Sequence, residues 1–221
     1  MSELDNLMQT IENLSINEDT KNKDTKNDIS INLLEQIVAD NNYVKNCKSN
    51  KKKDTSSLSY LVEKSLSQSE CIKLGKACES IFEDTVIKFT KLTNIKPKNK
   101  KGKKEKDLLF LNKDEKIIYY CEAKGNINLD TEKSKSTYKK CLHIVGELKQ
   151  QYPEHTINWC LLSVRYIDNS EIPEILKNKY QEIKDNLFGI NEFLEMFNIN
   201  FKFTKETYKK YINLIADKMV S

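Results

Sequence analysis

"YYCEAKGNINLDTEKSKST", residues 119–137, joins a strand-like run to a polar segment at a single glycine. The apolar and aromatic run ends in a carboxylate and an amine two positions apart, Glu122 and Lys124, and Gly125 then breaks it. Side chains two apart on a strand share a face, so Glu122 and Lys124 point the same way while Ala123 points to the other side. The sequence therefore predicts two opposite charges on one face at the end of a strand.

The segments around this stretch predict a sheet covered by helices. Two short strands, 107–112 and 116–124, are separated by "NKDE", which favours a hairpin. Both are apolar on both faces, which is typical of central strands with helices above and below. Helices are expected at 67–92 and from about 134 to 151, and a third buried strand at 156–166. This order is that of an α/β protein, and the crossover helix should leave its two flanking strands parallel.

The two flanks of this core are expected to be helical. Residues 1–65 are interpreted as a helical N-terminal appendage with a charged linker, residues 66–167 as the core, and residues 168–221 as a mostly helical C-terminal subdomain. The helical segments expected in the flanks are 4–14, 33–38, 173–187, 190–198 and 205–219, and 201–204 is expected to be a short strand.

Composition narrows the class of protein. A chain of 221 residues can bury a core of ordinary size, and it contains no apolar run of the roughly 20 residues that a membrane helix needs. The acidic N-terminus lacks the features of a signal peptide, so a cytoplasmic protein without a membrane segment is expected. The six cysteines include no CxxC pair and the two histidines are not at zinc-ligand spacing, which argues against a structural zinc site.

The charge of the chain is unevenly distributed. Residues 1–30 carry seven acidic and three basic side chains, so the rest of the chain carries a net charge of +8. Much of this charge sits in two lysine clusters, 45–53 and 96–106. Such clusters suit a polyanion such as nucleic acid, and a solvated loop is the alternative explanation for a lysine run.

A third charged residue, Asp107, begins the strand that should pair with the one ending at Glu122. The hairpin would bring these two carboxylates together, and they would repel each other unless a cation lay between them. Oxygen ligands of this kind suit Mg²⁺, and Lys124 could then orient or deprotonate an attacking water or stabilise a phosphorane-like transition state. This is the chemistry of phosphodiester hydrolysis, with an ordinary ion pair between Glu122 and Lys124 as the alternative.

These residues resemble the motif of the PD-(D/E)xK nuclease superfamily, and specifically that of small type II restriction endonucleases. "KD" at 106–107 and "EAK" at 122–124 match the motif, with Lys106 in place of its proline. "GKACE", which ends at Glu79, resembles an acidic element on the family's first helix. The resemblance covers about 67–166. It implies a restriction-endonuclease-like core: a helix, a three-stranded antiparallel meander, a second helix and a parallel strand.

The resemblance also implies roles and partners. Asp107, Glu122 and Glu79 would bind Mg²⁺, with Glu79 acting directly or through water, and Lys124 would serve the nucleophile. The substrate would be double-stranded DNA cut at a specific short sequence by a homodimer. A repair or recombination nuclease of the same fold and a non-catalytic DNA-binding module are the alternatives. Expected DNA contacts are Lys101, Lys103, Lys104, Asn126, Asn128, Thr131, Lys133, Ser134 and Lys135, whereas Tyr119, Tyr120 and Trp159 are assigned to the core.

Overall fold

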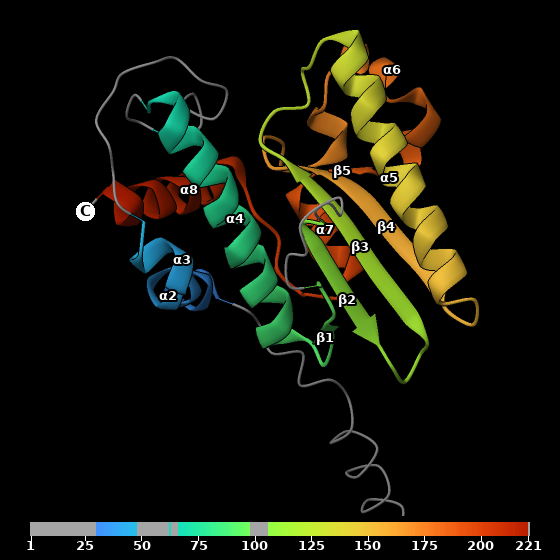
Figure 1. Cartoon of the computed structure of the whole chain (residues 1–221). Coiled ribbons are helices and arrows are strands. Elements are labelled where there is room, and N and C mark those ends of the chain that lie inside the picture. Colours follow the sequence, from blue (N-terminus) through green and yellow to red (C-terminus); the bar gives the residue numbers. More distant parts are fainter. Residues whose placement is uncertain (1–29, 48–61, 63–65, 98–105, 221) are drawn as a thin grey trace, which may run out of the picture.

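A computed structural model describes residues 30–47, 62, 66–97 and 106–220 (Figure 1). Its centre is a five-stranded mixed sheet in the order β1-β2-β3-β4-β5. Strands β1, β2 and β3 are antiparallel neighbours, whereas β4 runs parallel to β3 and β5 parallel to β4. The α/β class expected from the sequence is confirmed. The strands are β1 (Thr93–Asn94), β2 (Leu108–Asn112), β3 (Ile117–Lys124), β4 (Thr156–Ser163) and β5 (Leu187–Phe188).

The hairpin and the crossover expected from the sequence are both present. In the hairpin Leu108 pairs with Cys121 and Asn112 with Ile117, and Lys116 adopts a left-handed φ of 52° in the turn. The crossover is α5 (Thr131–Gln151), which connects β3 to β4 across one face of the sheet. As a result β2 begins where β3 ends, and the ends of β3 and β4 lie side by side.

The two long helices begin at recognisable caps. Helix α4 (Gln68–Phe89) starts with a reciprocal capping box between Ser67 and Glu70. Helix α5 starts at Thr131 because the Asp130 carboxylate accepts a 2.8 Å hydrogen bond from the Lys133 backbone N–H. The start expected near residue 134 was therefore three residues late, since Asp130 is the cap.

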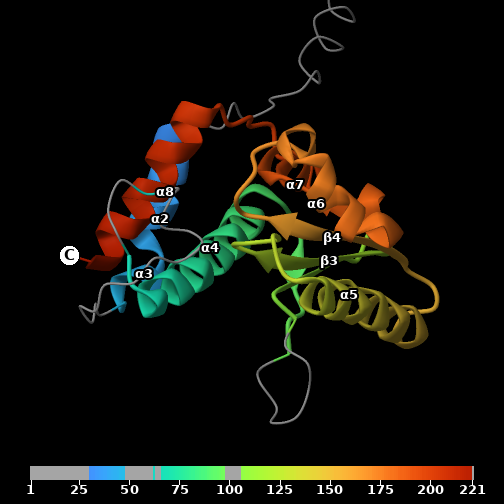
Figure 2. The same cartoon turned by 90° about the horizontal axis from the view of Figure 1, so that it is seen from above.

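Each face of the sheet carries its own core. On one face Phe110 and Leu162 pack in a cluster with α4, α7 (Ile190–Met196) and α8 (Lys205–Val220), which also receives the N-terminal α2 (Ile31–Asp40). On the other face Tyr120 and Leu161 pack beneath α5 and α6 (Glu174–Lys179). Figure 2 shows α5 on one side of β3 and β4 and α7 on the other. The short α3 (Asn42–Lys45) follows α2.

Two expectations for the C-terminal region were wrong. The helix expected at 173–187 ends at Lys179, a 3-10 turn (Gln181–Asn186) follows, and the chain then forms β5 at the edge of the sheet. Residues 201–204 are not a strand. Asn191 explains the second difference, because its side-chain amide accepts a hydrogen bond from the Phe203 N–H at 2.8 Å and donates one to the Phe203 carbonyl at 3.2 Å. These backbone groups are thus satisfied without a strand partner.

Of the other helices expected in the flanks, three are observed and one lies outside the described residues. The helices expected around 33–38, 190–198 and 205–219 correspond to α2, α7 and α8. The helix expected at 4–14 and the linker that follows lie outside the described residues. In the described part of the chain, no helix combines the length and hydropathy that crossing a membrane requires.

Candidate active site at the carboxyl end of β3

The structure brings Asp107, Glu122 and Lys124 together where β2 begins and β3 ends. Asp107 Oδ2 accepts a 2.9 Å hydrogen bond from the backbone N–H of Ala123, which fixes this carboxylate against the end of β3. Lys124 Nζ lies 2.7 Å from Glu122 Oε1. Glu122 and Lys124 share the sheet face of Tyr120, which is the face beneath α5. The convergence that the hairpin spacing predicts is thus observed.

Glu122 is the most enclosed charged group of this cluster. Its side chain is 0% exposed, and it accepts hydrogen bonds from three side chains. Lys140, on α5, lies 2.7 Å from both Oε1 and Oε2, and the Tyr120 hydroxyl donates to Oε2 at 3.0 Å. The carboxylate is therefore held by two ammonium groups and a phenol, which compensates for its removal from water.

The electrostatics of the cluster favour the charged form of Lys124 and disfavour the charged form of Asp107. Burial, reinforced by the neighbouring Glu122, raises the pKa of Asp107 above its usual value, against the opposing pull of Lys124. Burial alone would lower the pKa of Lys124, but Glu122 and Asp107 outweigh it, so this pKa lies above its usual value. Lys124 therefore stays protonated in this arrangement and can stabilise negative charge or orient a water, and it is not disposed to act as a base.

Two observations are compatible with a small hard cation at these carboxylates. Asp107 Oδ1 has no hydrogen-bond partner among the described residues, and two carboxylates this close would be relieved by a cation. Ser163, opposite Lys124 on β4, is fully buried, and its hydroxyl also lacks a partner within the described segments. An unsatisfied buried hydroxyl costs about 1–3 kcal/mol. Asp107 and Glu122 are thus the residues that could bind Mg²⁺.

Glu79 is placed differently from these two carboxylates. It is half-buried on α4, and its charge contributes to the raised pKa of Lys124, so it lies within electrostatic range of the cluster. Across residues 30–47, 62, 66–97 and 106–220, however, no three His, Cys, Asp or Glu side chains form a group that could hold a metal. Direct ligation by Glu79 is not present in this arrangement, and a role through water stays a prediction.

The loop after β3 and the first turns of α5 contain the predicted DNA contacts that the structure describes. Asn128, Thr131, Lys133 and Lys135 are exposed and Asn126 is half-buried, so these five side chains remain available to a ligand. Asn128 Oδ1 accepts from Lys179 Nζ at 3.1 Å, which ties the loop to the end of α6.

Ser134 does not fit the role expected for it. Its side chain is 1% exposed, and its hydroxyl donates to the Asp130 carbonyl at 2.8 Å. Because the helix begins at Thr131, Ser134 falls on the buried side of the first turn instead of in the loop. The predicted contact of Ser134 with DNA was therefore wrong.

The second lysine cluster is only partly described. Lys101, Lys103 and Lys104 lie outside the described residues. Lys96 donates to the backbone carbonyl of Asp107 at 2.8 Å, so the start of the cluster is anchored beside the site. Lys106 instead turns toward α5, where it lies 4.0 Å from Glu147.

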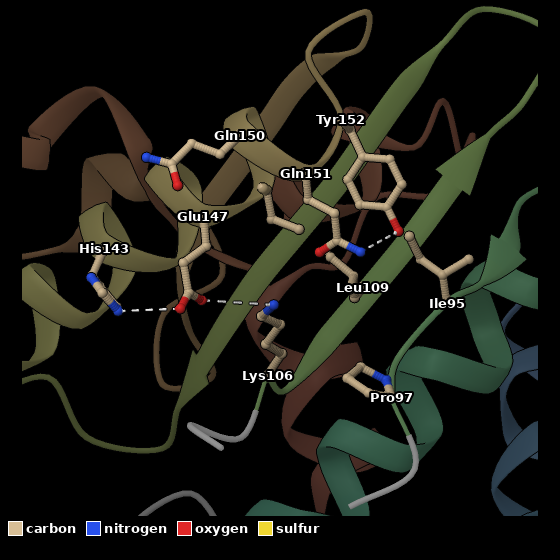
Figure 3. A pocket seen from close by; sticks show the side chains of 10 residues that line it. Ile95, Pro97, Lys106, Leu109, His143, Glu147, Gln150, Gln151 and Tyr152 are labelled. Carbon is tan, nitrogen blue, oxygen red and sulfur yellow. Dashed lines mark hydrogen bonds and ion pairs between the residues drawn. The ribbon is translucent and has the colours of Figure 1, made fainter. Parts of the chain in front are cut away.

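A hollow of about 730 Å³ lies between this Lys106 side chain, β2 and the second half of α5 (Figure 3). Leu109 and Leu148 contribute apolar side chains to it, and Glu147 lies at its edge between Lys106 and His143. Glu122, Lys124 and Lys140 are not among its lining residues. The hollow is therefore a neighbour of the charged cluster and not a part of it.

Sequence reasoning placed Tyr120 in the core correctly but missed Lys140 and the contact of the Tyr120 hydroxyl with Glu122. Tyr120 is buried as expected, yet its hydroxyl also reaches Glu122. Lys140 precedes the buried Cys141 and lies one turn before the buried Ile144, so helical phase places it at the margin of the apolar stripe. That position was the available signal, but "KK" at 139–140 does not by itself distinguish a surface lysine from one that turns inward.

Comparison of the chain with protein-family models, with curated proteins and with solved structures found no match in any of the three. A function must therefore be inferred from the side chains of the cluster itself.

Proposed function

We propose that this protein is a Mg²⁺-dependent type II restriction endonuclease of the PD-(D/E)xK superfamily, which hydrolyses phosphodiester bonds in double-stranded DNA at a specific short sequence. The proposal includes a restriction-endonuclease-like core, formed by α4, the β1–β3 meander, α5 and β4. It also includes a homodimer, because symmetric cuts in both strands require two active sites.

The observation that supports the proposal best is the meeting of Asp107, Glu122 and Lys124 at adjacent strand ends. Asp107 is fixed by the Ala123 N–H, and Glu122 and Lys124 are in direct contact on the α5 side. Two acidic groups can hold a metal ion, and a protonated lysine can stabilise the charge that develops in metal-assisted phosphodiester hydrolysis. The loop after β3 and the first turn of α5 follow directly, and their exposed side chains, Asn128, Thr131, Lys133 and Lys135, supply polar groups for a nucleic acid.

Each residue has a role in this chemistry that follows from its surroundings. Asp107 and Glu122 would hold Mg²⁺, which supplies Lewis-acid stabilisation of the phosphoryl oxygen and lowers the pKa of an attacking water. Lys124, held in its charged form by both carboxylates, would orient that water and stabilise the negative charge that develops on the phosphate. Tyr120 holds Glu122 Oε2 in place through its hydroxyl.

One specific observation favours a second candidate, a non-catalytic DNA-binding module. Both oxygens of Glu122 are engaged by lysines, which is also what a purely structural ion pair would show. A structural pair, however, does not account for Asp107, which is buried next to Glu122 with a raised pKa. Groups that disfavour each other in this way are typical of functional sites.

The test is incubation of the protein with a supercoiled plasmid and Mg²⁺, followed by sequencing of fragment ends. Discrete fragments with a common end sequence are expected, with no cleavage in EDTA. Progressive loss of nucleotides or structure-selective nicking would favour the repair or recombination nuclease. Binding without any cleavage would favour the DNA-binding module.

A further inference from the structure

Lys140 occupies the position on Glu122 that a metal ion would need. Its Nζ lies 2.7 Å from each carboxylate oxygen, so a single cationic atom bridges the two oxygens. Lys124 contacts only Oε1. Of the two lysines, Lys140 therefore has the geometry of a bidentate cation on this carboxylate.

At the strand ends the charges of the two carboxylates and of the lysines that contact Glu122 balance without a metal, and Glu79 adds a further negative field at Lys124. Two carboxylates, Asp107 and Glu122, face two ammonium groups, Lys124 and Lys140, around a carboxylate that is 0% exposed. Adding a divalent cation to this balanced cluster would place three cationic centres around two carboxylates, and the repulsion is large where water is excluded. One lysine must leave Glu122 before Mg²⁺ can bind well.

Lys140 is better placed to leave than Lys124. It reaches Glu122 from α5, a different element, and can withdraw along that helix surface, whereas exposure does not separate the two lysines, whose side chains are 25% and 33% exposed for Lys140 and Lys124. Lys124 lies on the same strand as Glu122, two residues away, and Asp107 adds to the attraction that holds it. A displaced Lys140 ammonium would remain at the site and could pair with a phosphate.

We propose that Lys140 is a positioning residue that occupies the metal side of Glu122 in the DNA-free protein and yields that position when Mg²⁺ binds. The inference deepens the proposed function and rests on it. It means that Mg²⁺ binds weakly until an anionic phosphate arrives, because the phosphate gives the displaced lysine a new partner. The protein would then assemble its metal site chiefly on DNA.

The test measures Mg²⁺ binding to the DNA-free full chain by titration calorimetry. Lys140→Met keeps the length of the aliphatic side chain and removes the charge, and it should bind Mg²⁺ about tenfold more tightly than the original protein, or more. Lys139→Met is the matched control, because Lys139 is the exposed neighbour on the same helix, and its affinity should be unchanged. Equal or weaker Mg²⁺ binding by Lys140→Met would overturn the proposal.

A second variant covers a failure of Lys140→Met to fold, which circular dichroism would reveal. Lys140→Gln can still donate a hydrogen bond to Glu122 but carries no charge, and it should also bind Mg²⁺ more tightly. The same preparations assayed on plasmid keep the two proposals apart. Tighter Mg²⁺ binding by the Lys140 variants, with no cleavage by the original protein, would leave the role of Lys140 standing and remove the nuclease function. Cleavage by the original protein, with unchanged Mg²⁺ binding by the variants, would keep the nuclease function and overturn the role of Lys140.

Discussion

Two glutamates each lie close to two basic side chains, Glu122 on β3 beneath α5 and Glu147 on α5 itself, but one is buried and the other is exposed. Glu122, at the end of β3, is 0% exposed and lies 2.7 Å from both Lys124 and Lys140. Glu147, on the outer part of α5, is 51% exposed and lies 4.0 Å from Lys106 and 3.4 Å from His143. The same chemical pattern therefore occurs once without access to water and once at the surface.

Burial decides what each arrangement can do. A charge at the surface is screened by water and salt, and exposed ion pairs are typically worth about 0–1 kcal/mol. A buried carboxylate must be compensated by its partners, and its field acts strongly on nearby groups, as the raised pKa values of Asp107 and Lys124 illustrate. Only the buried cluster has the strong, oriented field that catalysis needs.

The largest expected effect comes from removing the charge of Glu122 or of Lys124. Both Glu122→Gln and Lys124→Ala should lower the rate of plasmid cleavage at least about 100-fold, because Glu122→Gln removes a charge that would hold Mg²⁺ and Lys124→Ala removes the positive charge that would face the reacting phosphate. Glu122→Gln should also lose Mg²⁺ binding, whereas Lys124→Ala should retain it, since the lysine is not a ligand. Cleavage rates and Mg²⁺ calorimetry on the two variants measure this difference.

The fold should survive both changes. Glu122→Gln leaves two lysines without their counter-charge, but these side chains are 33% and 25% exposed and can turn toward water. We expect a loss of about 2 kcal/mol in the free energy of unfolding, below the roughly 3–5 kcal/mol typical of a fully buried pair. If both variants cut DNA at the original rate, Glu122 and Lys124 form a structural ion pair and nothing more.

A smaller effect, this time a gain in the free energy of unfolding, is expected from Asp107→Asn in metal-free buffer. The raised pKa of Asp107 means that folding disfavours its ionised form, so the original protein loses stability as the pH rises through this pKa. Asparagine keeps an oxygen that can accept from the Ala123 N–H and never ionises. Asp107→Asn should therefore raise the free energy of unfolding by about 1 kcal/mol at pH 7 while abolishing cleavage.

The pH dependence provides the internal control for this variant. Below the usual pKa of an aspartate, the original side chain is neutral in both the folded and the unfolded states, so the gain from Asp107→Asn should disappear near pH 3. Urea unfolding at pH 7 and at pH 3 measures the difference in the free energy of unfolding between Asp107→Asn and the original protein. A variant that is less stable than the original at pH 7 would mean that the two lysines stabilise the Asp107 carboxylate more than Glu122 and burial disfavour it.

The sequence predicted the part of the site that depends on local spacing. Period-two alternation put Glu122 and Lys124 on one face, and the hairpin spacing put Asp107 beside them. Lys140 could not be predicted in this way, because its approach to Glu122 depends on how α5 packs across the sheet, a contact between residues 18 positions apart. The role of Glu79 stays a prediction for a similar reason, since helical phase says which way its side chain points but not how close it comes to the strand ends.

The limits of the fold prediction have the same origin. The core was predictable from strong apolar periodicity, whereas the start of α5 depended on one capping bond from Asp130, and the fate of 201–204 depended on the distant Asn191. A "FKFT" segment has strand propensity, but the side chain of Asn191 satisfies its backbone instead. Tertiary contacts decided each of these details.

The smallest expected effect belongs to Glu147, the exposed counterpart of Glu122. Glu147→Gln removes the charge that faces Lys106 and His143. The Lys106 side chain is only 14% exposed, but its ammonium is 4.0 Å away and Glu147 itself is 51% exposed, so the free energy of unfolding should change by no more than about 0.5 kcal/mol. Any change should vanish at high salt, and cleavage of plasmid should proceed at the original rate, with Glu122→Gln assayed alongside as the inactive reference.

Lys106 is the neighbour of Asp107 and borders the 730 Å³ hollow, so this variant also probes that surface. A clear rise in DNA affinity with Glu147→Gln would contradict the argument that an exposed glutamate such as Glu147 has little influence on its neighbours. It would mean that Glu147 holds Lys106 away from the phosphates, and that the hollow beside the site belongs to the DNA-binding surface.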